Sequence, residues 1–206
     1  ELSHRMPLQL CDAWGITREP GKELHKMFKQ YKETLIHPLF VGWFCFLILE
    51  QKLKEIETKS DNVHIRQNNL VSKIVEIGIQ ESLQRRESSH HDAEDTDGQS
   101  EFVDLLKTFV AVAFHHSIHR PDEIFTRMVE FEYCNELSDS MKQSIMHDCG
   151  ILYLTGESIE WTHSTVPELI YADFFHDRQR SFKLGSLRVT EPILLRLAQL
   201  DYEEGR

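Results

Sequence analysis

The sequence predicts a mainly α-helical protein in which a helical domain is followed by a winged-helix domain with a small β-hairpin. Apolar residues recur at spacings of three and four over long stretches, which is the helical period. A polar, acidic segment interrupts this pattern, and the elements after it follow the order helix, helix, helix, hairpin. We therefore predict a helical domain at 1–86, an acidic flexible loop at 87–100, a winged-helix domain at 101–178 and the start of a further helical segment at 179–206.

The predicted helical domain contains three helical stretches. Between 21 and 36 the apolar residues form one stripe, and Pro38 ends that helix because its ring disfavours a helical conformation in the residue before it. An apolar stretch at about 39–57 predicts a buried helix. The segment 68–86 predicts a third helix with its apolar residues on one side.

The segment 87–100, ESSHHDAEDTDGQS, holds a single apolar side chain and several acids. Such a segment cannot bury enough apolar surface to offset the entropy lost on ordering. It is predicted to be an exposed, flexible loop and the boundary between the two domains.

The second half of the chain is predicted to form short elements in close succession. Helices are expected at 101–119, at 120–134, where Pro121 fits the first turn, and at 138–150. The stretch 151–162 alternates between apolar and polar residues and turns at a glycine, as a β-hairpin does.

A last helix of this domain is predicted to begin at Thr165. Thr165 and Glu168 have the spacing of a capping box, in which each side chain binds the backbone N–H of the other residue. His163 would therefore lie at the corner between the hairpin and the helix.

The charge distribution argues against a nucleic-acid partner. The formal net charge is −11 at pH 7, which disfavours binding to nucleic acid or to an anionic membrane. The helix at the position of a recognition helix offers only Lys142 and His147 as basic residues, against Asp139 and Asp148. We expect a winged helix that packs against protein and does not read DNA.

Two further features predict a cytoplasmic protein without a membrane partner. The longest apolar run, 38–49, is shorter than the ~20 residues that span a bilayer, so it predicts a buried helix. The four cysteines lie far apart with no CxxC pair, which is typical of reduced thiols in an intracellular protein.

None of the candidate chemical sites has a complete set of residues. The segment 15–23, GITREPGKE, resembles a phosphate loop, but its glycines are one residue too far apart and Glu23 replaces the magnesium-binding Ser or Thr. His115 and His119 have a metal-ligand spacing on a helix, but too few other ligands accompany them, so a partly buried or solvated histidine cluster is favoured. No nucleophile and histidine occur in a catalytic context. We predict no catalytic residues, no metal site and no enzyme activity for this chain by itself.

The segments 37–48, HPLFVGWFCFLI, and 159–175, IEWTHSTVPELIYADFF, carry a resemblance to a known family. The first is similar to the proline-led segment that opens the first helical domain of NACHT-type STAND NTPases, signal-transducing ATPases related to NOD-like receptors. The second is similar to the histidine motif at the end of their winged-helix domain. It departs from that motif at Pro167, where the family usually has glutamine or arginine, and at Asp173, where the family has a small residue.

This resemblance implies a regulatory function that depends on a nucleotide. In that family the matching proline packs on adenine and the matching histidine contacts the β-phosphate of bound ADP, so Pro38 and His163 would be nucleotide-binding residues. The region 1–86 would hold the end of a nucleotide-binding region and the first helical domain. ADP or ATP would bind only in a longer parent protein, whose nucleotide-binding subdomain would lie before Glu1. The partners would be that subdomain and, on activation, other copies of the parent.

The chemistry of the corner is compatible with a phosphate, but simpler interpretations stay open. An imidazole nitrogen can donate to a phosphate oxygen, and the N-terminus of the following helix adds a positive end. His163 could instead cap the helix or pack beneath Trp161, and Pro38 could simply start a helix. The alternative function is a stand-alone helical domain that binds protein and has no nucleotide role. Nucleotide binding by the parent would separate these two functions.

Overall fold

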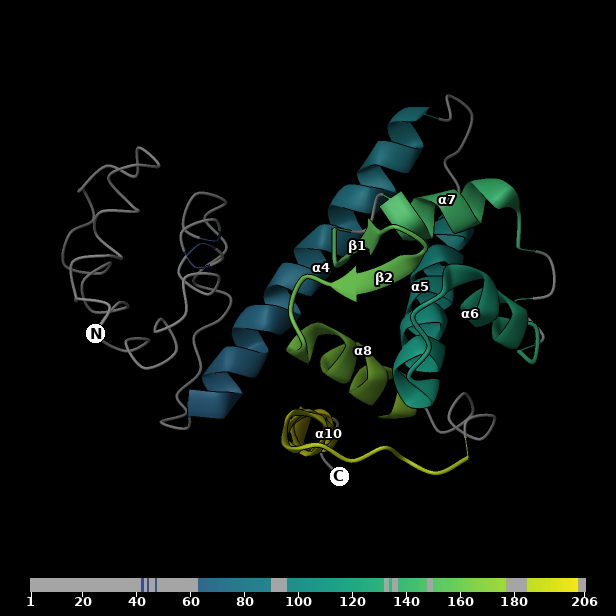
Figure 1. Ribbon diagram of the computed structural model, residues 1–206. Coiled ribbons are helices and arrows are strands. Elements are labelled where there is room, and N and C mark those ends of the chain that lie inside the picture. Colours follow the sequence, from purple (N-terminus) through teal and green to yellow (C-terminus); the bar gives the residue numbers. More distant parts are fainter. Residues whose placement is uncertain are drawn as a thin grey trace, which may run out of the picture. The chain divides into compact units, whose positions relative to one another are not determined.

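The computed structural model describes residues 42, 44, 47, 63–89, 96–131, 134, 137–147, 150–176 and 185–203. Within them the fold is mainly helical with one small antiparallel sheet, which confirms that part of the predicted fold class. In chain order the elements are α4 (Val63–Ser89), α5 (Thr96–His116), α6 (Pro121–Met128), α7 (Asp139–His147), β1 (Leu152–Thr155), β2 (Ser158–Trp161), α8 (Thr165–His176) and α10 (Glu191–Glu203) (Figure 1).

The chain divides into two compact units, Glu1–Ile74 and Val75–Arg206, and the division falls inside α4. The predicted loop at 87–100 was therefore wrong as the boundary, and it was also too long. α4 continues to Ser89 and α5 begins at Thr96, so both ends of that segment are helical, while 90–95 lie outside the described residues. A low apolar content limits burial, but it does not prevent a polar segment from extending a helix that its neighbours have already nucleated.

In the first unit the description is limited to a few helical residues and the start of α4. Phe44 and Leu47 are helical and buried, as are Leu70 and Val71 on α4. The helix predicted at 21–36 lies outside the described residues, and so does Pro38.

The core of the second unit is built around α8, which packs against both α5 and α10 (Figure 1). A helix that is covered on two sides needs apolar residues around most of its circumference. This accounts for the buried side chains of α8, which are Val166, Pro167, Leu169, Ile170, Tyr171, Ala172 and Phe174. α5 contributes an apolar face with Phe102, Leu105, Leu106, Phe109 and Val110.

Long apolar helices raise the question of a membrane span. Among the described helices, none combines the length and the apolar content that crossing a bilayer requires.

α5 ends at His116, three residues before the predicted end, in a Schellman motif. The N–H of Ser117 donates to the carbonyl of Phe114 at 3.3 Å, and the N–H of Ile118 donates to that of Ala113 at 2.9 Å. Ser117 has φ 54°, the left-handed conformation in which glycine is the usual residue. The turn takes the chain off the helix axis, so His119 lies in the connection to α6.

α6 also ends earlier than predicted, at Met128 instead of 134. The N–H of Phe131 donates to the carbonyl of Met128, and the Phe131 ring packs edge-on against Phe174 of α8 at 5.9 Å between centroids. The chain therefore leaves the helix to place Phe131 in the core. Tertiary packing of this kind overrides local helical propensity.

The predicted β-hairpin is confirmed. Leu152 lies opposite Trp161, and Thr155 lies opposite Ser158. Gly156, with φ 63°, supplies the positive φ that the two-residue turn requires. The N–H of Ile159 donates to the carbonyl of His119 at 2.7 Å, which ties β2 to the connection between α5 and α6.

Candidate functional site

The corner between β2 and α8 is held at its start by Thr162. Both the N–H and the hydroxyl of Thr162 donate to the carbonyl of Ile151, at 3.1 and 3.0 Å. Ile151 comes directly before β1, so the two ends of the hairpin are tied together. This closure positions the next residue, His163, at the entrance to α8.

His163 caps α8 through both its side chain and its backbone. The Thr165 N–H donates to the His163 Nδ1 at 3.1 Å, and the Val166 N–H donates to the His163 carbonyl at 3.0 Å. Thr165 is the first helical residue, not the residue that caps the helix. The predicted capping box between Thr165 and Glu168 was therefore wrong, because the imidazole takes the N–H that Glu168 was expected to bind.

The N-terminus of α8 is less open to an anion than the sequence implied. The N–H groups of Thr165 and Val166 are bound by His163, and Pro167 has no N–H. The first three positions of α8 therefore leave no unpaired donor for a phosphate. Pro167, one of the two departures from the family motif, contributes directly to this.

The cap determines the tautomer of His163. Since Nδ1 accepts a hydrogen bond, the proton of the neutral ring is on Nε2. Nε2 is thus the one ring atom that could donate to a phosphate oxygen. The imidazole combines a structural role at Nδ1 with a possible donor at Nε2.

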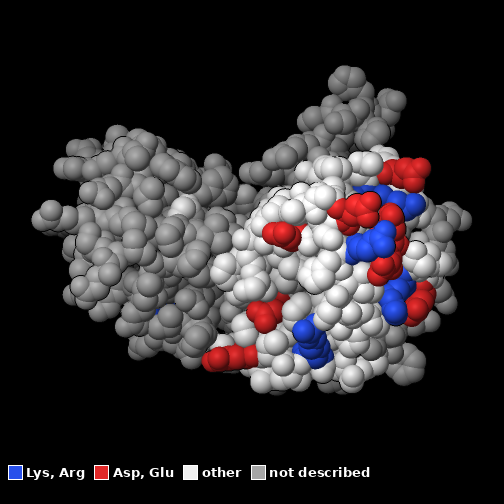
Figure 2. Space-filling model, in the orientation of Figure 1, with Lys and Arg blue, Asp and Glu red and all other residues white. Residues whose placement is uncertain are grey.

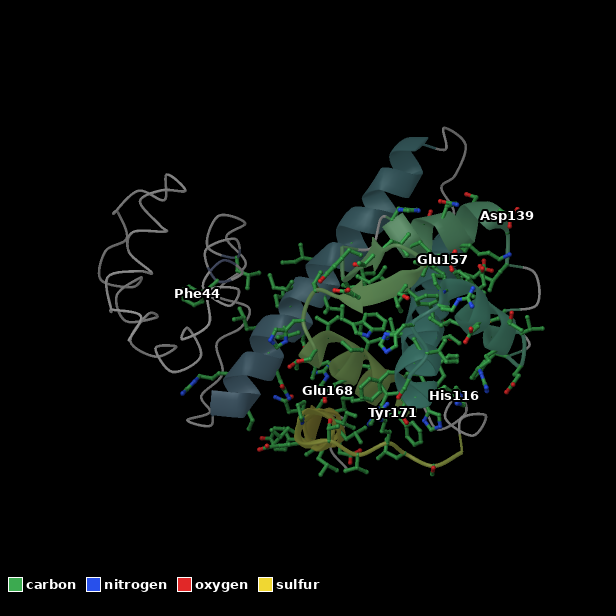
Figure 3. The ribbon with its side chains drawn as sticks, viewed as in Figure 1. Phe44, His116, Asp139, Glu157, Glu168 and Tyr171 are labelled. Carbon is green, nitrogen blue, oxygen red and sulfur yellow. The ribbon has the colours of Figure 1, made fainter. Side chains whose placement is uncertain are left out.

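Glu168, labelled in Figure 3, lies in the first turn of α8. Its carboxyl interacts with Thr190 and Arg188, which precede α10. Burial raises the pKa of its carboxyl, while the Thr190 hydroxyl and the Arg188 guanidinium oppose this rise. The Thr190 oxygen is buried and makes no hydrogen bond of good geometry, so we regard its effect on the carboxyl as weak. The folded state thus favours a protonated Glu168 more than water does.

Pro38, the other predicted nucleotide contact, lies outside the described residues. The structure therefore describes only one of the two predicted site residues, His163.

The histidines considered as metal ligands have other roles. His115 is at the end of α5, where its Nδ1 is 2.9 Å from the Tyr171 hydroxyl, whereas His119 has left the helix. Across the part of the chain that the structure describes, no group of three His, Cys, Asp or Glu side chains could hold a metal ion. Burial raises the pKa of the Cys134 thiol to about 12, so this buried cysteine stays protonated.

Sequence reasoning missed two clusters of side chains around α8. Tyr171 binds His115 and also accepts from the Arg188 N–H at 3.0 Å. Asp173 accepts from Arg196 of α10, with 2.7 Å between Nε and Oδ1. The sequence marked the second cluster, because Asp173 is the other departure from the family motif. It did not mark the first cluster, since residues 115, 171 and 188 are too far apart to form a local pattern.

Comparisons with known proteins complete this description of the site. Neither a protein-family model, nor a curated protein, nor a solved structure matches this chain.

Proposed function

We propose that this chain is the regulatory winged-helix module of a STAND-type signalling ATPase, in which His163 contacts bound ADP and favours a closed, resting state. The observation that carries the proposal is the geometry of His163. Its Nδ1 is engaged in capping α8, which leaves the proton on Nε2 and fixes the orientation of the ring. A donor held in this way can distinguish a correctly placed phosphate oxygen from one that is displaced.

The order of elements in the second unit supports a winged helix. In that fold a short strand between the first two helices pairs with the second strand of the hairpin. Here the described sheet has two strands, and one hydrogen bond links it to the connection between α5 and α6: the His119 carbonyl accepts from Ile159 of β2 at 2.7 Å. This bond and the series α5, α6, α7, β1 and β2 support the proposal.

The charges favour a winged helix that packs on protein over one that binds DNA. Arg120 lies 3.6 Å from both Glu123 and Glu157, and Lys142 lies 3.3 Å from Asp139. On the face shown in Figure 2, lysines and arginines lie among aspartates and glutamates. Cations that already face carboxylates cannot provide the unpaired positive surface that DNA phosphates require.

The proposed mechanism is a shift between two states. In the closed state His163 would donate from Nε2 to the β-phosphate of ADP, and in the open, ATP-bound state that contact would be lost. Only a contact made differently in the two states can move such an equilibrium. This proposal also includes Pro38, ADP and ATP, the nucleotide-binding subdomain and further copies of the parent. The fold of α8 needs none of them.

The rival function is a stand-alone helical domain that binds protein. It is favoured by the role of Nδ1, because a capping histidine already has a structural reason to be at this corner. It predicts no nucleotide binding by the complete protein.

Two isosteric variants separate the capping role of His163 from the proposed donor role. His163→Asn keeps an acceptor near the position of Nδ1 but removes the Nε2 donor, whereas His163→Gln places an amide donor near Nε2 and loses the cap. In the complete protein, ADP should dissociate from His163→Asn about tenfold faster or more, as expected for a lost hydrogen bond to a charged group. His163→Gln should retain more of the ADP affinity but lose stability.

The measurements are the ADP dissociation rate, ATP affinity and resting oligomer content, each alongside chemical denaturation. His147→Asn, at the end of α7, is the matched control for a histidine change that should alter none of them. Unchanged ADP dissociation in a stable His163→Asn protein would refute the donor role. If the complete protein binds no nucleotide at all, the rival function stands.

A further inference from the structure

Arg188 holds the segment 185–190, which leads into α10, against the C-terminal end of α5. Its Nη1 donates to the Phe114 carbonyl at 2.6 Å and to the Ser117 hydroxyl at 2.8 Å. Its guanidinium carbon lies 4.7 Å from the centre of the Phe114 ring. A cation at this position satisfies a terminal helix carbonyl and interacts favourably with the negative end of the helix dipole.

The backbone of Ser117 gives a second, independent indication that this contact is specific. The residue adopts φ 54°, which is unfavourable for any side chain and which glycine would adopt without cost. Serine nevertheless occupies the position, and its hydroxyl is one of the two groups that accept from Arg188. A strained residue whose side chain takes part in a contact between distant segments points to a function for that contact.

A chain of hydrogen bonds connects the same segment to a titratable group. The Arg188 N–H donates to the Tyr171 hydroxyl at 3.0 Å, and that hydroxyl lies 2.9 Å from the His115 Nδ1. The phenol oxygen accepts from Arg188, and its own proton can be donated to His115 when that ring is neutral with a bare Nδ1. Tyr171 and His116 mark this region in Figure 3.

We propose that Arg188, Tyr171 and His115 form an acid-sensitive latch that holds residues 185–190 on α5 while His115 is neutral and releases them when it is protonated. Protonation puts a hydrogen on Nδ1, so the bond to Tyr171 reverses: two donors then point at one phenol oxygen, and the phenol proton loses His115 as its acceptor. Protonation also places a second positive charge near Arg188. The latch does not depend on the proposed nucleotide role.

The charges around His115 act in the direction that the latch requires. Burial, then the His116 ring on the same helix, then the Arg188 guanidinium lower the pKa of His115 below its ordinary 6.5. Burial also lowers the pKa of His116, as does Arg127 from α6, while Glu130 raises it. The neutral rings are therefore the forms that the closed latch favours, and acidification below 6.5 works against it.

One group on α8 responds to acid in the opposite sense and has to be separated from the latch. Glu168 faces Arg188 and is more easily protonated when buried, so its titration favours the packed state at low pH. α10 has its own contacts with α8, among them Arg196 with Asp173 at 2.7 Å. Acid should therefore release 185–190 while α10 stays on α8.

The experiment measures the protection of the Arg188 amide against hydrogen exchange by NMR in the whole chain, corrected for the intrinsic effect of pH. Between about pH 7.5 and about pH 5.5, wild-type protection should fall about tenfold, the size expected when a hydrogen bond beside a charge is lost. His115→Asn keeps an acceptor near the position of Nδ1 and cannot titrate, so its protection should stay constant. His147→Asn is the matched control and should behave as wild type.

Two internal readouts and one further variant keep the result decisive. The Ile159 amide, bound to His119, reports that the fold is intact, and the Leu194 amide, bound to Thr190 at 3.1 Å, reports that α10 still begins normally. The response should persist in Glu168→Gln, which removes the opposing carboxyl. Constant Arg188 protection in the wild type, or a full response in His115→Asn, would overturn the latch.

Discussion

Ser117 is a single residue at which two local effects oppose each other. Its left-handed backbone costs roughly 1 kcal/mol relative to glycine, whereas its hydroxyl accepts from Arg188 at 2.8 Å, a bond that contributes roughly 0.5–1.5 kcal/mol. These magnitudes are similar, so serine and glycine should be close in stability here. Alanine, which keeps the strain and loses the bond, should be the worst of the three.

We therefore predict that Ser117→Ala lowers the free energy of unfolding by about 1 kcal/mol, while Ser117→Gly changes it by less than about 0.5 kcal/mol. Chemical denaturation of both variants beside wild type measures this. If alanine costs nothing and glycine stabilises by about 1 kcal/mol, the hydroxyl contributes nothing and the contact with Arg188 is incidental.

The residue scale is also where prediction from the sequence was least complete. The spacing after the hairpin correctly placed the start of α8 at Thr165. The same spacing assigned the cap to the wrong side chain. From the sequence alone, a capping box between Thr165 and Glu168 and a cap formed by His163 on Thr165 are equally acceptable. The tie between Thr162 and Ile151, which comes from the closed hairpin, helps to bring the imidazole over the helix end.

At the scale of elements, Arg196 of α10 and Asp173 of α8 form a charged pair with two hydrogen bonds. Arg196 donates to Asp173 from two nitrogens, at 2.7 and 3.4 Å. The side chains are only 17% and 28% exposed, so water screens them less than an open pair. Asp139 and Lys142 on α7 form the natural comparison, because that pair is 98% and 38% exposed.

A double-mutant cycle with Asp173→Asn and Arg196→Met should give a coupling energy of about 1–2 kcal/mol, since partial burial strengthens the pair. The same cycle with Asp139→Asn and Lys142→Met should give less than about 0.5 kcal/mol. Denaturant unfolding of each single and double variant supplies both values. Equal coupling in the two cycles would mean that the pair between α8 and α10 is no better than a surface contact.

Elements were easier to predict than residues because periodicity is a local property. The helix, helix, helix, hairpin order after residue 100 follows from apolar spacing and from Pro121 and Gly156. Helix ends were missed where a distant contact determined them. α6 stops so that Phe131 can reach Phe174, and α5 stops in a turn that Arg188 covers. Phe174 and Arg188 lie far along the chain from these helix ends, so the local sequence around each end does not reveal them.

At the scale of the whole molecule, stability should respond to acid through two opposing sets of groups. His115 and His116 have lowered pKa values, so their contribution is complete above 6.5 and is lost as the pH falls through their folded-state values. Glu168 has a raised pKa, so its contribution is complete below 4.5 and is lost as the pH rises through its folded-state value. Between 4.5 and 6.5 the two effects partly cancel.

This cancellation yields a prediction for Glu168→Gln. At neutral pH the variant should be more stable than wild type, by a fraction of the ~1–3 kcal/mol that an uncompensated buried polar group costs, because it removes a charge that burial disfavours. On acidification it should lose stability more steeply than wild type, since the histidines then act without an opposing group. His115→Asn should show the reverse, a shallower loss. Unfolding free energies measured at half-unit steps from about pH 7.5 to about pH 4.5 test both slopes. Parallel curves for wild type and Glu168→Gln would show that the carboxyl is solvated and that its proximity to Arg188 has no energetic consequence.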